Sequence, residues 1–300
     1  MKISELMEKH GLPAKDDYNL WTSNRTFPDK THYKIEISGI ERLQTLTTMI
    51  DEMKHRKVPV HRIVATVSGS TYLDDDELNE MAMLCKKKKI EAIVTPGPRT
   101  PWDIGRQLST PEGILSGIRV RGSDNLGYLI EEIFRLIDLG FRGFLVLDEG
   151  VLWLLNEMRR NEDIPKECFF KVSIYTGHGN AASARVLQSL GADSFNPVCD
   201  LTLPMIASIR YAITIPMDIH ILIADSFGGI NRMHETPEIA RIASPCYFKL
   251  EPGPTLCIAG GVYKPWTSDE VLNQLAREKV KYAGRIIDMV ADKYPELRVK

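Results

Sequence analysis

Four ionisable residues stand near the ends of predicted strands, where their side chains could share one site. They are Glu36, His220, Lys249 and Glu251. Each lies on the polar face of a segment in which apolar and polar residues alternate. Carboxylates and an imidazole held close together act as general acids and bases, and they also bind divalent metal ions. The pattern therefore predicts an acid–base or metal site, with Lys249 as the electrostatic partner.

Other charged residues on the same strand faces lie deeper, closer to where each strand begins. These are Lys34, Lys171 and Asp218. A buried charge costs several kcal/mol unless it is paired. We therefore expect these three side chains to form a structural ion-pair lattice at the floor of the fold. Glu36, His220 and Glu251 lie nearer the functional end and are expected to take part in the chemistry.

Two further carboxylates, Asp200 and Glu149, follow other predicted strands, and Asp200 is also a candidate catalytic residue. Either one, together with Glu36, His220 and Glu251, would give a divalent metal ion mixed carboxylate and imidazole ligands. The sequence leaves the cofactor open otherwise. It contains no Walker A, H-E-x-x-H, G-x-S-x-G or dinucleotide-binding motif, which disfavours P-loop, zincin and nucleophile-elbow chemistry.

The elements that carry these residues alternate between strand and helix along the chain. Eight segments are predicted strands: Tyr33–Ser38, Arg62–Ser68, Glu91–Pro96, Phe144–Glu149, Phe170–Thr176, Ser194–Asp200, Met217–Ala224 and Tyr247–Glu251. A helical pattern follows each of them. Eight βα units indicate a closed (β/α)8 TIM-type barrel, with an open doubly wound sheet as the alternative. Active sites of such barrels lie at the carboxyl ends of the strands.

The length of 300 residues exceeds the ~250 that a barrel needs, yet no linker divides the chain. We predict a single barrel domain over residues 1–300. The surplus is assigned to an N-terminal extension (1–32), an insertion after the third strand (97–122) and a C-terminal helix (267–300). Capping-box spacing at Ser38–Glu41 and at Thr267–Glu270 predicts where two of the helices begin.

The loops after the strands supply candidate substrate-binding residues. They are Arg99, His178, Ser226, Gly228, Gly229 and Gly253. An arginine can clamp a carboxylate or phosphate group. Glycines let backbone N–H groups approach an anion closely, although a simple turn explains them equally well. His178, between two glycines, is expected to be exposed and available for catalysis or binding.

Composition limits the partners and the compartment. The chain has 38 basic and 40 acidic residues, so its net charge of −2 gives no general attraction to nucleic acid. No apolar run is long enough for a membrane span, and no signal peptide is visible. Five scattered cysteines fit a reducing cytoplasm. We expect a small-molecule substrate, no nucleic acid and no membrane, with a homo-oligomer left open.

One stretch, Ala182–Pro216, resembles a segment of the collagenase-like peptidases of family U-32. There a helix ending in Leu-Gly leads to a strand, an acidic-Leu-x-Leu step and another helix. Asp200-Leu201-Thr202-Leu203 matches that step, with Asp in place of the usual Glu. The His-Gly pair and cysteine cluster of the family are absent from this chain. The resemblance implies a bacterial barrel enzyme with peptidase-like hydrolytic activity, and Asp200 is the matched position.

Three functions follow as hypotheses. The first is a cytosolic barrel enzyme that hydrolyses a small polar or anionic substrate by acid–base or metal-assisted chemistry. The second is a lyase or isomerase acting on a phosphorylated or carboxylated metabolite, in which Lys249 forms a Schiff base or acts electrostatically. The third is a non-catalytic barrel that binds a small molecule and uses its internal charges only for structure.

Overall fold

The protein is a parallel β-barrel enclosed by helices, seen here in a computed structural model that describes residues 2–97, 118–224, 227–251, 263–264 and 266–300. The barrel strands are β1 (Tyr33–Ile40), β2 (Arg62–Ala65), β3 (Glu91–Val94), β4 (Gly143–Val146), β5 (Phe169–Val172), β6 (Ser194–Phe195), β7 (Met217–Ile223) and β9 (Cys246–Leu250). Neighbours pair in parallel from β1 to β7. The ring closes through β7–β9 and β9–β1. The (β/α)8 barrel predicted from the sequence is confirmed, and the open sheet is wrong.

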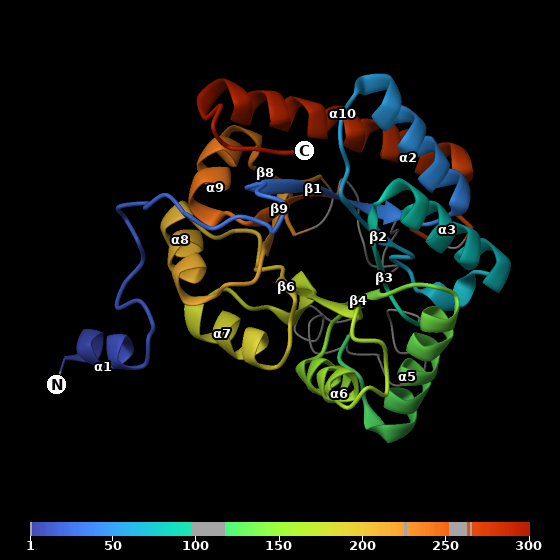
Figure 1. Cartoon of the computed structure of the whole chain (residues 1–300), viewed down its shortest axis with the longest axis horizontal. Helices are drawn as coiled ribbons and strands as arrows, with labels where there is room; N and C mark the ends of the chain where they lie inside the picture. Colours follow the sequence, from blue (N-terminus) through green and yellow to red (C-terminus); the bar gives the residue numbers. More distant parts are fainter. Residues whose placement is uncertain (1, 98–117, 225–226, 252–262, 265) are drawn as a thin grey trace.

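Helices surround this ring of strands, as Figure 1 shows. They are α1 (Ile3–Lys9), α2 (Leu43–Arg56), α3 (Asp75–Lys88), α5 (Gly122–Asp138), α6 (Glu149–Arg160), α7 (Ala181–Ser189), α8 (Leu203–Ala212), α9 (Thr236–Ala243) and α10 (Asp269–Lys293). The short α1 lies apart from the barrel. Most of the predicted insertion 97–122 lies outside the described residues. Within the described ranges, no helix is long and apolar enough to cross a membrane.

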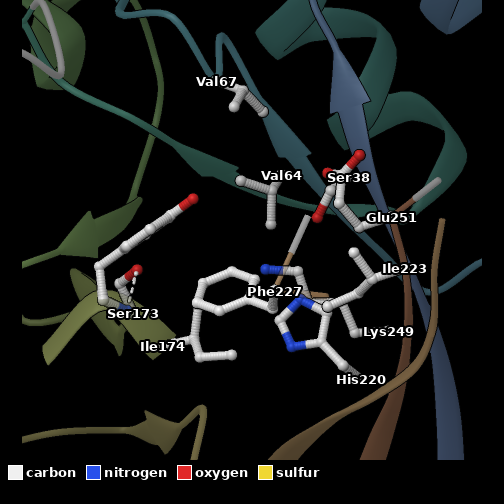
Figure 2. A pocket seen from close by; sticks show the side chains of 11 residues that line it. Ser38, Val64, Val67, Ser173, Ile174, His220, Ile223, Phe227, Lys249 and Glu251 are labelled. Carbon is white, nitrogen blue, oxygen red and sulfur yellow. Dashed lines mark hydrogen bonds between the residues drawn. The ribbon is translucent and has the colours of Figure 1, made fainter. Parts of the chain in front are cut away.

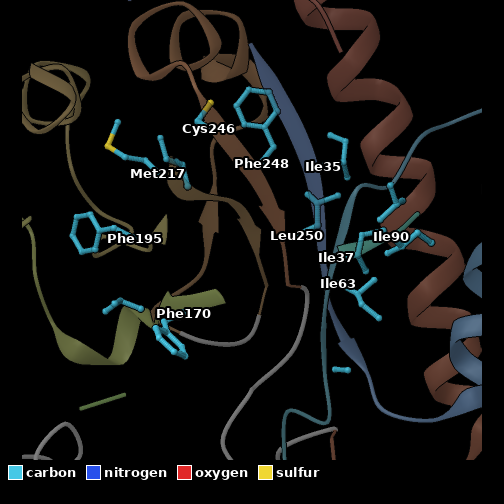
Figure 3. Packing of buried hydrophobic residues seen from close by; sticks show 14 of the residues in the cluster. Ile35, Ile37, Ile63, Ile90, Phe170, Phe195, Met217, Cys246, Phe248 and Leu250 are labelled. Atoms are coloured by element: carbon cyan, nitrogen blue, oxygen red, sulfur yellow. The ribbon is translucent and has the colours of Figure 1, made fainter. Parts of the chain in front are cut away.

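The alternation along the strands separates the apolar core from the polar interior. Ile35 and Ile37 of β1 are fully buried on the face that the helices cover, as are Phe248 and Leu250 of β9. Figure 3 shows these side chains in the layer between strands and helices. The intervening residues of the same strands point into the barrel. Burial of this apolar layer stabilises the fold. The polar side chains inside the barrel must then form hydrogen bonds and ion pairs with one another.

The structure differs from the expected helix starts in two places. Ser38 belongs to β1, which runs on to Ile40, so Ser38 and Glu41 do not cap α2. The first turn of α2 is capped from outside, because Glu77 of α3 accepts the backbone N–H of Leu43 at 3.0 Å. The last helix has its N-cap at Ser268, one residue after the predicted Thr267. Both predictions were wrong because a tertiary contact or a shifted register replaced the local signal.

A short antiparallel strand, β8 (Ile230–Asn231), was not predicted. It pairs with the end of β7 through Ile223 and forms a hairpin. Gly228 and Gly229 lie in its turn with positive φ values of 78° and 79°. These φ values fit the turn explanation, and the role of both glycines in substrate binding stays a prediction.

Candidate functional site

The floor of the barrel holds a fully buried ion-pair lattice of four charged residues. Arg62 bridges Glu36 and Asp218 through its guanidinium. Lys171 Nζ lies 3.1 Å from Glu36 Oε1 and 2.5 Å from Asp218 Oδ2. All four side chains have no exposed surface. Two carboxylates and two cations therefore neutralise each other inside the barrel, as charges removed from water must.

The lattice is locked by further contacts to neighbouring strands. Ser194 Oγ donates to Asp218 Oδ2 at 2.7 Å. The Arg62 guanidinium carbon lies 3.4 Å from the centre of the Tyr247 ring. Although burial alone would raise it, the pKa of Asp218 is held below its usual value by Arg62 and Lys171. Burial lowers the pKa of Lys171.

Sequence reasoning placed Lys171 and Asp218 in such a lattice and missed Arg62. Arg62 lies on the face of its strand opposite the apolar Ile63 and Ala65, so the alternation that selected Glu36 also points to Arg62. Lys34 lies outside the lattice, where its Nζ pairs with Asp29 at 2.9 Å. Glu36 belongs to the lattice and does not line the cavity above it.

Above the lattice lies a cavity at the carboxyl ends of the strands (Figure 2). Its polar lining includes Ser38 of β1, His220 of β7, Lys249 of β9 and Glu251, the residue that follows β9. Phe227 forms part of the apolar lining and is 41% exposed. The free space of about 10 Å³ holds roughly one water molecule. A larger ligand therefore enters only if a lining side chain such as Phe227 moves.

Register brings the polar residues together in two cross-strand pairs. His220 lies opposite Lys249 in the β7–β9 pairing. Ile37 lies opposite Leu250 in the β1–β9 pairing, so the next residues, Ser38 and Glu251, are neighbours at the strand ends. Adjacent strands are about 4.8 Å apart. Three of the four residues predicted to share a site therefore line one cavity.

His220 is held as a neutral imidazole by its surroundings. Burial lowers its pKa well below the usual value, and the charges of Lys249 and Lys171 lower it further. Asn196 Oδ1 accepts from Lys249 Nζ at 3.4 Å, and its Nδ2 donates to the Asp218 carbonyl at 2.7 Å. The amide nitrogen therefore faces His220 Nδ1, 3.2 Å away. Since Nδ1 must accept, the ring proton is on Nε2.

Lys249 is nearly buried and connects the lattice to the cavity. It is 6% exposed, and its Nζ lies 3.7 Å from Glu36 Oε1. Glu36 is already bound by Arg62 and Lys171, so Lys249 adds a third cation to two lattice carboxylates. This positive charge lies at the floor of the cavity, which favours an anionic group there.

Glu251 is oriented by a hydrogen-bond chain from α10. Lys279 Nζ donates to the Tyr263 hydroxyl oxygen at 3.0 Å, and that hydroxyl donates to Glu251 Oε1 at 2.5 Å. Burial and the nearby Glu251 raise the pKa of Tyr263 well above its usual value, so the hydroxyl keeps its proton. Glu251 Oε2 is buried without a hydrogen-bond partner in the described structure. Oε1 is thus held by Tyr263, whereas Oε2 is available to accept a hydrogen bond or a proton.

The close packing of Tyr263 depends on Gly39. Gly39 has a φ of 75° at a bulge near the end of β1. A Cβ at this position would overlap the Tyr263 ring, which no side chain tolerates. Glycine is therefore needed both for the backbone conformation and for the approach of Tyr263.

A second buried carboxyl, Glu41, lies close to this chain and gives a prediction for stability. Burial raises its pKa to about 7, although the backbone N–H groups of Val67 and Ser68 donate to it and oppose the rise. The folded protein therefore holds this proton more tightly than the unfolded chain does. Its contribution is fully present below about pH 4.5 and is lost as pH rises to about 7.

We expect Glu41→Gln to remove this pH dependence. Relative to the wild type, the variant should gain about 3 kcal/mol of unfolding free energy between pH 4.5 and 7.5. Urea unfolding of both proteins across this range measures the difference. A difference that stays constant with pH would show that Glu41 titrates alike in the folded and unfolded states.

Two other predicted site residues, Asp200 and His178, are not part of the cavity lining. Asp200 is exposed after β6. His178 is only partly exposed and belongs to a separate ion-pair cluster: its Nε2 lies 2.6 Å from Glu149 Oε1, and Arg119 binds the other oxygen at 2.6 Å. Despite the opposing effect of burial, these partners lower the pKa of Glu149. Arg99, Ser226 and Gly253 lie outside the described residues.

The predicted ligand set for a divalent metal is not assembled. Glu36 points into the lattice, Glu149 into the His178 cluster and Asp200 to solvent. Across the described ranges, no three His, Cys, Asp or Glu side chains converge as a metal site would require. The acid–base interpretation of His220 and Glu251 does not depend on that ligand set.

Comparison with known proteins supports the fold. No family model matches the sequence, and no curated protein matches it. The YdjI aldolase from Escherichia coli K12 has a similar structure, with a TM-score of 0.51 and 15% identity over 89% of this chain and 94% of the aldolase. D-psicose 3-epimerase from Clostridium cellulolyticum H10 gives a TM-score of 0.44 and 13% identity over 84% of this chain and 98% of the epimerase.

The U32 peptidase Mk0906 gives a TM-score of 0.39 and 16% identity over 67% of this chain and 73% of the peptidase. Identities this low show a shared fold alone. The expected resemblance to the U-32 family is therefore not shown beyond the barrel fold itself. The chain has the fold of TIM-barrel enzymes, with a polar cavity at the end where such barrels hold their active sites.

Proposed function

We propose that this protein is a lyase or isomerase that moves a proton next to the carbonyl group of a small carboxylated or phosphorylated compound. The observation that carries this proposal is that the neutral imidazole of His220, the side chain of Lys249 and the carboxylate of Glu251 line one cavity. One oxygen of that carboxylate has no hydrogen-bond partner in the described structure. The aldolase and epimerase among the similar structures are named for reactions of this general kind, and they add only fold-level support.

The three side chains have complementary roles in this proposal. Glu251 Oε2 accepts a proton from the carbon next to the carbonyl, and the electron pair moves onto the carbonyl oxygen. His220 Nε2–H and the Lys249 ammonium stabilise the resulting enolate oxygen. Returning the proton to the opposite face of the same carbon gives an epimer. When that carbon carries a hydroxyl, returning the proton to the former carbonyl carbon gives an isomer, because the hydroxyl loses its proton and becomes the new carbonyl. In a lyase reaction the electron pair of the enolate instead expels a leaving group, with its bonding electrons, from the next carbon.

The state of His220 favours this chemistry over hydrolysis, which was the first hypothesis from the sequence. An imidazole with a strongly lowered pKa is a weak base for activating water. The same neutral imidazole is a good hydrogen-bond donor to a developing oxyanion. The positive charge of Lys249 nearby strengthens that role and suits an anionic substrate.

Exchange of carbon-bound protons in D2O tests the proposal whatever product the enzyme forms. Proton NMR would follow pyruvate, hydroxypyruvate, hydroxyacetone phosphate and dihydroxyacetone phosphate with the wild type and with Glu251→Gln. We expect enzyme-dependent loss of signal next to the carbonyl in at least one compound, and its abolition in the variant. Exchange at the uncatalysed rate with all four compounds would contradict the proposed function.

Lys249 is expected to act as an ammonium and not as a Schiff-base nucleophile. Its Nζ is paired with the carboxylate of Glu36, 3.7 Å away. Borohydride reduction with a compound that undergoes exchange should therefore leave Lys249 unmodified by mass spectrometry. A reduced adduct on Lys249 would replace the electrostatic role with covalent catalysis.

A further inference from the structure

The hydroxyl group of Ser38 lines the cavity but has no role in the proposed proton transfer. Ser38 is 2% exposed, and its Oγ is buried without a hydrogen-bond partner in the described structure. A buried hydroxyl without a partner is costly, and such groups are uncommon in folded proteins. Its place in the lining of the cavity points to a ligand as the missing partner.

The position of Ser38 is fixed by its own backbone. Lys279 donates to the Ser38 carbonyl oxygen, and the same ammonium donates to Tyr263, which holds Glu251. One buried lysine of α10 therefore sets the positions of both cavity residues. Lys279 has no exposed surface, so water does not compete for these hydrogen bonds.

The two unoccupied groups are chemically complementary to a hydroxyl. Glu251 Oε2 can only accept a hydrogen bond when the carboxyl is ionised, whereas Ser38 Oγ can donate. A ligand hydroxyl can donate to the first and accept from the second at the same time. A carboxylate oxygen has two lone pairs, so Glu251 Oε2 can accept this hydroxyl with one of them while the other faces the carbon-bound proton. Ser38 and Glu251 follow directly on the paired residues Ile37 and Leu250, which places them side by side at one wall (Figure 2).

We propose that Ser38, together with Glu251, selects a substrate that carries a hydroxyl on the carbon next to its carbonyl group. This inference rests on the proposed function, because it places the carbonyl oxygen at His220 and Lys249. The substrate class is then an α-hydroxy carbonyl compound with an acidic group. Ser38 determines specificity and takes no part in the proton transfer itself.

Matched pairs of compounds test the assignment. Calorimetric titration would compare hydroxypyruvate with pyruvate, and dihydroxyacetone phosphate with hydroxyacetone phosphate, which differ only by that hydroxyl. We expect the wild type to bind the hydroxylated member of at least one pair about tenfold more tightly or better. Ser38→Ala should reduce the ratio to within about twofold by weakening only the hydroxylated member.

Ser173→Ala is the matched control. Ser173 lines the same cavity, but its Oγ already accepts the backbone N–H of Tyr175 at 3.3 Å. The control should keep the wild-type preference. Persistence of the preference in Ser38→Ala, or its loss in both variants, would overturn the role of Ser38.

The remaining outcomes separate the two proposals. Equal binding of both members by the wild type, with proton exchange still observed, would overturn the hydroxyl subsite and leave the proposed function standing. Absence of both binding and exchange for all four compounds would overturn both.

Discussion

Replacing His220 by alanine should slow the exchange of carbon-bound protons by about 10²–10³-fold. That is the effect of removing one hydrogen-bond donor from an oxyanion site. The imidazole is neutral, its Nδ1 accepts from Asn196 at 3.2 Å, and its proton is on Nε2. NMR in D2O measures the rate directly, and circular dichroism checks that the variant is folded.

His220→Gln distinguishes a donor from a base. A glutamine amide can place an N–H group near the position of Nε2–H, so this variant should retain at least about tenfold more exchange activity than His220→Ala. A general base has no such substitute, because an amide does not take up a proton at neutral pH. Equal loss in both variants would therefore assign His220 as the base, and wild-type rates in both would remove it from the mechanism.

Replacing Arg62 by methionine should cost about 3–5 kcal/mol of unfolding free energy, the usual effect of removing one partner from a buried ion pair. Arg62 joins Glu36 and Asp218, and all three side chains are fully buried. Among the described residues, their carboxylates would keep Lys171 and the more distant Lys249 as cations. Urea unfolding, analysed by linear extrapolation, measures the loss.

An exposed ion pair provides the control for this lattice. Arg160 lies 2.8 Å from Glu157 on α6, and its side chain is 69% exposed, so Arg160→Met should change stability by about 0.5 kcal/mol or less. Adding Asp218→Asn to Arg62→Met should restore part of the loss, because one unpaired carboxylate is removed. If Arg62→Met were as mild as Arg160→Met, the lattice would not be a structural element.

The sequence predicted the barrel well because strand alternation is a strong local signal. The start of β1 at Tyr33 and of β7 at Met217 match the predicted residues. The same alternation placed His220, Lys249 and Glu251 inside the barrel. Local sequence patterns do not predict contacts between distant segments. The cap on α2, for example, comes from Glu77 of another helix.

The composition of the site was harder to predict than its location. Glu36 lies opposite Lys249 in the strand register, and Glu251 comes two residues later on that neighbouring strand. Only this register separates a lattice carboxylate from a cavity carboxylate. The link from Lys279 to Glu251 joins α10 to the strand ends through Tyr263. Ser38 was expected to cap a helix, and its place in the cavity follows from the extension of β1.

The protonation state of His220 is the most direct test of the account, because it requires no substrate. Nitrogen-15 NMR of the imidazole across pH 5.5–8 reports both the charge and the tautomer. We predict a neutral ring throughout, with the proton on Nε2 and with Nδ1 as acceptor, because burial and two lysines lower its pKa. A ring that titrates near the ordinary value of 6.5, or one that carries its proton on Nδ1, would contradict the proposed site.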